Sequence, residues 1–193
     1  MPDKAFFVGD HAALDFLNTV AAPRGEVIES IADGEAYVSW LADAGLLGAT
    51  EARVILDRFG GPALDKVAGE ARDLREWFRR RITKPAAEAI TKLNQILAMD
   101  CVQRQLERSG RRLVLREKRV FTQARQLLTP VVQAIAELVT DDNPSLIKRC
   151  ANQNCTLWFY DRTKAHRRRF CSPAVCGNRA KVAAFRERQR QIK

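Results

Sequence analysis

The sequence predicts an α+β protein in two parts, a mainly helical N-terminal domain with a minor β-sheet and a small cysteine-rich C-terminal module. Apolar residues recur at helical spacing through much of the first 140 residues. Four of the five cysteines lie between Cys150 and Cys176. Between these regions, turn formers from Asp141 to Ser145 mark a change of composition, so we expect domains at residues 1–145 and 146–193.

Helices account for most of the expected N-terminal domain. Pro130 lies within the last apolar series and predicts a kink there or a division into two helices. The apolar faces are predicted from residues spaced three or four apart: Tyr37, Trp40, Leu41 and Ala44; Leu64, Val67, Ala71, Leu74 and Phe78; Ile90, Leu93 and Leu97; Phe121, Ala124, Leu128, Val131, Ile135 and Leu138.

Strand signals are fewer. Leu113–Leu115 is expected to form a strand after a turn at Ser109 and Gly110. Phe6–Val8 and Leu14–Leu17 fit either short strands or the starts of helices. The predicted sheet is therefore minor.

Composition restricts the class of protein. The chain has 193 residues, of which 46% are hydrophobic and 29% charged, which suits a folded domain with a small appendage. The longest stretch without Asp, Glu, Lys or Arg is 11 residues, whereas a membrane-spanning helix needs about 20 apolar residues. The N-terminus does not resemble a secretory signal. We therefore expect a cytoplasmic protein with no membrane partner.

Positive charge is concentrated near the C-terminus. Residues 148–193 contain 13 Lys and Arg against two acids, Asp161 and Glu187, whereas residues 1–147 contain 20 bases and 21 acids. This asymmetry predicts a polyanion-binding appendage on a nearly neutral domain.

The cysteine spacing predicts a metal site. Cys150 and Cys155 form one pair, and Cys171 and Cys176 form a second pair with the same spacing after fifteen intervening residues. Four thiolates in two pairs suit one structural zinc ion with a closed coordination sphere, while an iron–sulfur cluster or a redox pair are the alternatives. Cys101 stands apart and is expected to be a small buried side chain.

The segments around the cysteines predict a treble-clef-like zinc finger. Thr156–Tyr160 and Arg167–Phe170 are expected to pair as a β-hairpin between the two cysteine pairs. A helix is expected from Asn178 to Arg190, with Val182 and Phe185 packed inward. Because so small a module cannot fold on apolar burial alone, zinc must supply much of its stability. We expect the N-terminal helices to survive the loss of the site.

The finger resembles a known family. Cys176, Gly177, Asn178 and Arg179, preceded by Arg168–Cys171, closely resemble the CGNR zinc finger. Members of that family pair the finger with an N-terminal ABATE domain, whose signature Leu14–Thr19 resembles. The resemblance implies a four-cysteine zinc site, a DNA-binding finger, a small ligand in the N-terminal domain and a role in stress-induced transcription.

Two sets of site residues follow. Phosphate contacts, and readout of guanine edges, are predicted for basic residues of the finger, although a solvated helix face or support of the zinc site by Arg179 would also explain some of them: Arg167, Arg168, Arg169, Arg179, Lys181, Arg186, Arg188 and Arg190. Polar residues of the N-terminal domain either line a ligand pocket or cap helix ends: Asp15, Asn18, Arg24 and Arg75.

The leading functional hypothesis is a transcription regulator that binds duplex DNA through the finger, while the N-terminal domain senses a ligand or forms a homodimer. The alternatives are an RNA-binding or ribosome-associated zinc ribbon and a protein-interaction adaptor. The adjacent aromatics Trp158–Tyr160 are expected in the finger core rather than stacked on bases. An enzyme is not expected, because the sequence has no phosphate-binding glycine loop, no histidine pair and no nucleophile motif.

Overall fold

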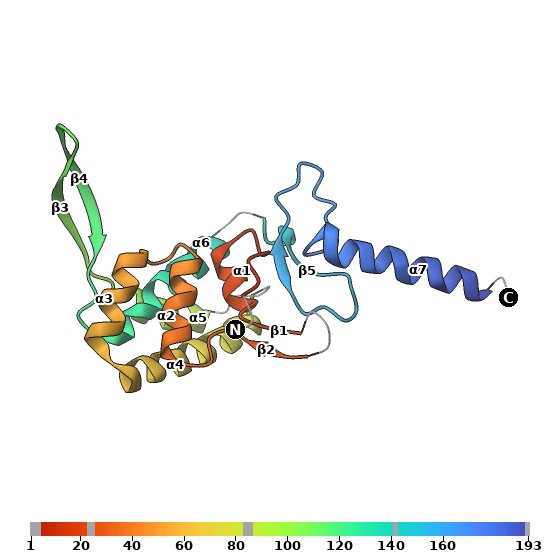
Figure 1. Cartoon of the computed structure of the whole chain (residues 1–193), viewed down its shortest axis with the longest axis horizontal. Coiled ribbons are helices and arrows are strands. Elements are labelled where there is room, and N and C mark those ends of the chain that lie inside the picture. The colour runs from red at the N-terminus through yellow and green to blue at the C-terminus, as the bar shows by residue number, and fades with distance from the viewer. Residues whose placement is uncertain (1–4, 23–25, 83–86, 141–142, 192–193) are drawn as a thin grey trace.

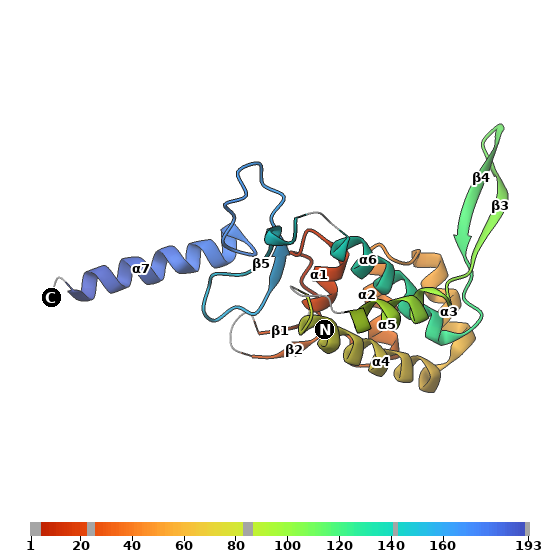
Figure 2. The ribbon, with the colours of Figure 1, turned by 180° about the vertical axis from the view of Figure 1, so that it is seen from behind.

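The structure is a computed structural model that describes residues 5–22, 26–82, 87–140 and 143–191. A helical body occupies the centre of an elongated molecule (Figure 1). A long β-hairpin projects from one end of the body, and the C-terminal helix extends from the other end (Figures 1 and 2). The α+β class and the two-part architecture with clustered cysteines are as predicted.

Within the described residues, the body contains six α-helices that bury one apolar core. Phe16, Tyr37, Phe78 and Ile135 are fully or almost fully buried in it. Gly34 allows the helix that it begins to pack closely against the helix that contains Leu64, because a Cβ added at Gly34 would lie only 2.3 Å from the Leu64 Cβ. The helices are α1 (Ala12–Leu17), α2 (Gly34–Asp43), α3 (Ala49–Phe59), α4 (Gly61–Arg79), α5 (Ala87–Leu97) and α6 (Thr129–Val139).

Proline and capping residues set where these helices begin. The backbone N–H of Ala13 donates to the His11 ring, which caps α1, so Leu14–Leu17 is helical and not a strand. Pro130 lies in the first turn of α6, where its missing N–H costs no hydrogen bond. The preceding residues form a 3₁₀ turn, Ala124–Leu128, so the predicted division at the proline is confirmed.

The part of the chain that the structure describes also forms three separate two-stranded antiparallel sheets. They pair β1 (Val20–Ala21) with β2 (Ile28–Glu29), β3 (Val102–Ser109) with β4 (Arg112–Arg119), and β5 (Ile147–Arg149) with β6 (Trp158–Tyr160). The predicted strand at Leu113–Leu115 lies within β4. Phe6–Val8 forms no strand, and Phe6 and Val8 instead pack against the cysteine cluster.

The strand pairing expected for the finger is wrong. β6 does contain the predicted aromatic residues, but its partner is β5, which precedes the first cysteine pair. Arg167–Phe170 forms no strand, although the Arg169 carbonyl accepts from the backbone N–H of Ala151, 2.8 Å away. The hairpin therefore encloses Cys150 and Cys155 instead of lying between the two cysteine pairs.

The C-terminal helix is also only partly as expected. Helix α7 (Asn178–Gln191) forms where predicted and is preceded by a π-helical turn, Pro173–Gly177. However, Val182 and Phe185 remain 49% and 56% exposed, because α7 extends away from the rest of the molecule (Figures 1 and 2). Their helical spacing therefore does not reflect packing within this chain.

The finger and the helical body are joined by specific contacts. The Asn18 side-chain amide, at the end of α1, bonds both to the backbone N–H and to the carbonyl of Trp158, at 2.8 and 2.9 Å. The backbone N–H of Tyr160 donates to the Gly9 carbonyl at 2.8 Å. Ile147 and Tyr160 belong to the core of the body. The predicted boundary at residue 145 is therefore crossed by a shared core.

Candidate zinc centre and nucleic-acid interface

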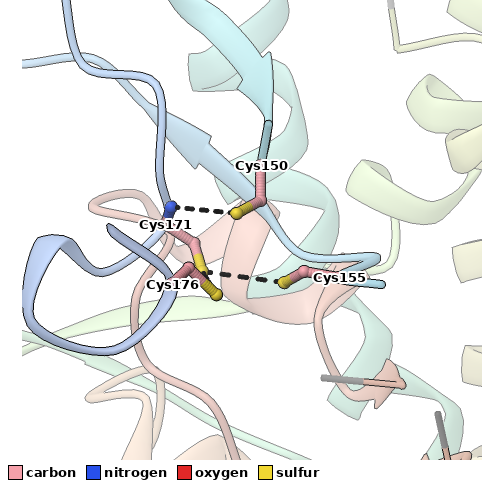
Figure 3. Close-up of side chains that lie close together, drawn as sticks. All are labelled: Cys150, Cys155, Cys171 and Cys176. Atoms are coloured by element: carbon pink, nitrogen blue, oxygen red, sulfur yellow. Dashed lines mark hydrogen bonds between the residues drawn. The ribbon is translucent and has the colours of Figure 1, made fainter. Parts of the chain in front are cut away.

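The four predicted metal ligands converge on one point. The sulfur atoms of Cys150, Cys155, Cys171 and Cys176 all lie within 4.8 Å of one another, and all four residues are buried (Figure 3). The Cys155–Cys171 and Cys171–Cys176 sulfur separations are 3.8 and 3.6 Å. Tetrahedral Zn–S bonds of about 2.3 Å require sulfur separations of about 3.8 Å. The cysteines thus form one structural zinc site.

Local structure presents each sulfur to the site. Cys150 directly follows β5, and Cys155 follows a turn closed by its own N–H bond to the Asn152 carbonyl at 2.9 Å. The backbone N–H of Cys171 points at the Cys150 sulfur, 3.5 Å away (Figure 3). Cys176 lies in the π-helical turn that leads into α7. Cys176 therefore lies just before the N-terminus of α7, the positive end of the helix dipole, which favours a thiolate nearby.

The ionisation of the thiols shows why a cation belongs among them. The hydrogen bond from Cys171 lowers the pKa of the Cys155 thiol to about 5. That same bond and burial raise the pKa of Cys171 far above its ordinary value, and burial raises the pKa of Cys176 to about 11. Four thiolates cannot gather here on their own, and Zn²⁺ supplies the charge that deprotonates them together.

A buried carboxylate organises the long loop between β6 and Cys171. Asp161 is fully buried and accepts from the Lys148 ammonium at 2.7 Å, from the Thr163 hydroxyl and amide, and from the backbone N–H of Arg168. Burial alone would raise the pKa of Asp161, but the ion pair with Lys148 and these hydrogen bonds hold it well below the usual range. The loop that carries Arg167 therefore folds around a permanent negative charge.

Arg168 has a structural position that the sequence did not reveal. Its guanidinium pairs with the Asp10 carboxylate and donates to the carbonyls of Val8 and Cys171. It also lies 4.3 Å from the centre of the Phe159 ring. The side chain is only 15% exposed. These hydrogen bonds attach the loop to the N-terminal segment, so the Arg168 side chain, predicted to contact phosphate, instead has a structural position.

The other predicted basic residues lie at the surface. Arg167 and Arg169 are exposed on the loop, and Arg169 lies beside the Phe170 ring. Lys181, Arg186, Arg188 and Arg190 are exposed along α7, whereas Arg179 is half-buried and lines a pocket against Ala151–Asn154. Of the adjacent aromatics, Phe159 is fully buried in the cluster with the four cysteines, as expected for the core of the finger. Tyr160 instead belongs to the core of the helical body, and Trp158 packs against that core.

Among the predicted ligand-binding residues, the three that the structure describes are each bonded to other groups of the protein. Asn18 is occupied by the backbone of β6, and the buried Arg75 bonds Glu29 through two nitrogens at 2.8 and 2.6 Å. Asp15 accepts from the backbone N–H of Gly9, 2.7 Å away. Arg24 lies outside the described residues. These contacts give the three described side chains structural roles.

A different pocket lies between the helical body and the finger. It has a volume of about 410 Å³, and Val20–Ala22 and Val27 form its apolar side. Arg79 lines it from α4, and Arg149 and Trp158 line it from the finger. Burial lowers the pKa of Arg79, the ion pair with Glu76 opposes this shift, and the nearby charges of Arg75 and Arg149 add to it. Two guanidinium groups, of which that of Arg79 is paired with Glu76, thus lie beside the apolar side of this pocket.

The fold and the cysteine site together define a two-part zinc-finger protein, a helical domain joined to a four-cysteine finger. The chain belongs to the ABATE family: its family model, described as "Putative stress-induced transcription regulator", matches residues 10–142. The model of the CGNR zinc finger matches residues 147–189. Both matches agree with the resemblance seen in the sequence. No sequence among the curated proteins matches the chain.

No described helix combines the length and the apolar character needed to cross a bilayer.

Proposed function

We propose that this protein is a transcription regulator, and not an enzyme, whose zinc finger binds duplex DNA in the cytoplasm. One observation carries the proposal: α7 leaves the zinc site, extends away from the body, and holds five basic residues against one acid, Glu187 (Figure 1). Lys181, Arg186, Arg188 and Arg190 are all exposed. One acid cannot neutralise these charges, so a polyanion is the natural partner.

The dimensions of α7 suit a duplex. Fourteen helical residues span about 21 Å, and the major groove is wide enough to admit an α-helix. Arg179, Arg186 and Arg190 are spaced by seven and four residues, which places them on one side of the helix. The zinc site fixes the end of α7 nearest the body. A helix held at one end and free along its length can lie in a groove without rearranging the core.

The direct test replaces three charges on α7. An Arg186→Gln, Arg188→Gln, Arg190→Gln variant should bind a labelled DNA duplex more weakly. The slope of log affinity against log salt should fall in magnitude by about 0.9 for each phosphate that the variant no longer neutralises. A matched control, Arg53→Gln, Lys66→Gln, Arg80→Gln, removes the same charge from exposed positions of α3 and α4 and near the end of α4. Equal affinity in the two variants would contradict the role of α7.

RNA or single-stranded DNA is the second candidate, and one residue favours it. Phe185 is 56% exposed among the arginines of α7 and can stack on an unpaired base. The aromatics of β6 do not add to such a platform, because Phe159 is buried and Trp158 lies beside the Arg149 guanidinium. Competition between duplex and single strands separates the two targets; if neither competes above background, the adaptor hypothesis is favoured.

The proposal also gives the N-terminal domain a sensory role. A small anion in the pocket of Arg79, Arg149 and Trp158 would contact the helical body and the finger at once. The affinity of the pocket for the anion would then depend on the relative position of the helical body and the finger. Such a dependence is what allows a bound ligand to change the DNA affinity of the finger. A homodimer completes the proposal, since a single finger buries little DNA surface and a second copy would add to it.

A further inference from the structure

The long β3–β4 hairpin belongs neither to the zinc finger nor to the apolar core of the helical body, as far as the described residues show. It projects from the helical body at the end opposite α7 (Figures 1 and 2). Its eight-residue strands, Val102–Ser109 and Arg112–Arg119, give it a length of about 27 Å. Leu106, Leu113 and Leu115 are 71%, 68% and 64% exposed. Such a hairpin contributes little to the core.

The hairpin is strongly basic. Residues 102–119 contain seven Lys and Arg but only two Glu. The rest of residues 1–147 contains thirteen bases and nineteen acids, so the near-neutral total for that region hides a cationic arm on an acidic body. Positive charge therefore gathers at both ends of the molecule, and not only on the finger.

The charges differ between the shaft and the tip of the hairpin. Along the shaft, Arg104 pairs with Glu117 and Arg116 pairs with Glu107, both at 3.2 Å. At its base, Arg119 pairs with Asp100 at 2.6 Å. These pairs brace the two strands and anchor them to the body.

No acid lies in the turn itself. The tip carries Arg108, Arg111 and Arg112 around Gly110, whose φ of +63° allows the two-residue turn. None of these three arginines has an ion pair among the residues that the structure describes. The arm is thus braced along its shaft and leaves uncompensated positive charge at its end.

One face of the arm combines apolar and cationic side chains. The register pairs Leu106 with Leu115 and Arg108 with Leu113, and side chains alternate between faces, so these four lie on one face. An exposed strand face with three leucines invites contact with another molecule. Because the hairpin is positively charged, it would repel the hairpin of a second copy of the chain. A polyanion would instead be attracted to it.

We propose that the tip of the β3–β4 hairpin is a second nucleic-acid contact, in which the ribbon enters a groove of a duplex. Arg108, Arg111 and Arg112 bind phosphates beside the groove, and the leucines contact sugars and base edges. The major groove admits a two-stranded ribbon of this kind. The inference rests on the proposal that the protein binds nucleic acid, but it does not require α7 to be a contact.

The test uses the full-length, zinc-loaded protein and a labelled duplex. An Arg108→Gln, Arg111→Gln, Arg112→Gln variant should weaken binding about tenfold or more at moderate salt and reduce the magnitude of the salt slope by about 2 or more. The Arg53, Lys66, Arg80 control loses the same charge and should retain both. Because all six residues are exposed, zinc content and the circular dichroism spectrum should match the parent protein.

The outcomes separate the two proposals. If the tip variant loses affinity and slope while the control does not, the hairpin is a contact, whatever the α7 variant does. If only the α7 variant loses binding, the hairpin inference is wrong and the proposed function stands. If the tip variant changes only the oligomeric state, measured by sedimentation, the arm contacts protein and the inference is overturned. Absence of duplex binding by the parent protein overturns both.

Discussion

Arg167 and Arg168 are neighbours in the sequence with opposite surroundings. Arg167 is exposed, whereas Arg168 bonds Asp10 and the carbonyls of Val8 and Cys171. Arg168→Gln should therefore lower the free energy of unfolding by about 1–3 kcal/mol, since part-buried charge-assisted hydrogen bonds to Val8 and Cys171 are removed. Arg167→Gln should leave stability unchanged and weaken duplex binding. Urea unfolding of both variants checks this, and equal stability would refute the assignment of Arg168.

Asp15 offers a prediction that depends on pH. Burial raises its pKa from 3.8 to about 6, against the hydrogen bond from Gly9. The folded protein therefore binds this proton more tightly than the unfolded chain, so the group favours folding at low pH and this contribution is lost as the pH rises through 6. Asp15→Asn keeps the acceptor for Gly9 without the charge. It should stabilise the protein at pH 8 by about 1–2 kcal/mol, after allowing for partial solvent screening.

The pH dependence separates this effect from simple packing. The advantage of Asp15→Asn should shrink by about 1 kcal/mol between pH 8 and pH 5. Asp57→Asn, at an exposed site on α3, is the control and should show no such trend. Urea unfolding at several pH values is the measurement. A variant that is less stable at pH 8, or whose advantage is constant with pH, would contradict the account of Asp15.

At the scale of elements, the join between finger and body modifies the expectation of independent domains. Cys171→Ser should abolish zinc binding and disorder the finger, while Cys101→Ser, outside the cluster, should not. The helices should persist but melt several degrees lower, because Ile147 and Tyr160 belong to their core, and about 1 kcal/mol corresponds to roughly 2–4 °C. Far-UV circular dichroism with temperature checks this. An unchanged melting temperature for the helices would show that the two parts are independent.

The elements also show how far the sequence could predict the fold. The core helices and the cysteine site follow from local rules, since apolar residues at helical spacing must find a core and four paired cysteines must find a metal. The partner of β6 could not be predicted, because β5 and Arg167–Phe170 are both adjacent to a cysteine pair. In α7 the apolar spacing of Val182 and Phe185 was misleading, since a helix can present that spacing to a partner as well as to its own core.

The missed site residues depend on contacts that are distant in sequence. Asp161 is the only acid between Lys148 and Arg186, and that isolation among bases was a signal of a carboxylate held by cations. The partnership of Arg168 with Asp10 spans 158 positions and has no local signature. The arm charge at Arg108–Arg112 was visible in the sequence but was averaged out when residues 1–147 were counted together.

At the scale of the whole molecule, positive charge lies at two ends of an elongated protein. The loop after β6 and the β3–β4 hairpin both point toward the top of the picture in the two views (Figures 1 and 2). The zinc site fixes the direction of α7, and the small pocket of Arg79 and Arg149 lies where the body meets the finger.

We propose that the zinc finger binds duplex nucleic acid through its exposed basic side chains. The most direct measurement is a titration of labelled duplex with zinc-loaded protein between about 50 and 200 mM salt. We expect binding that weakens steeply with salt, with a log–log slope of about −0.9 for each phosphate neutralised. The Cys171→Ser variant, which cannot hold the zinc, should bind more weakly because the finger no longer contributes. Binding that is indistinguishable from background, or that does not change with salt and zinc, would contradict it.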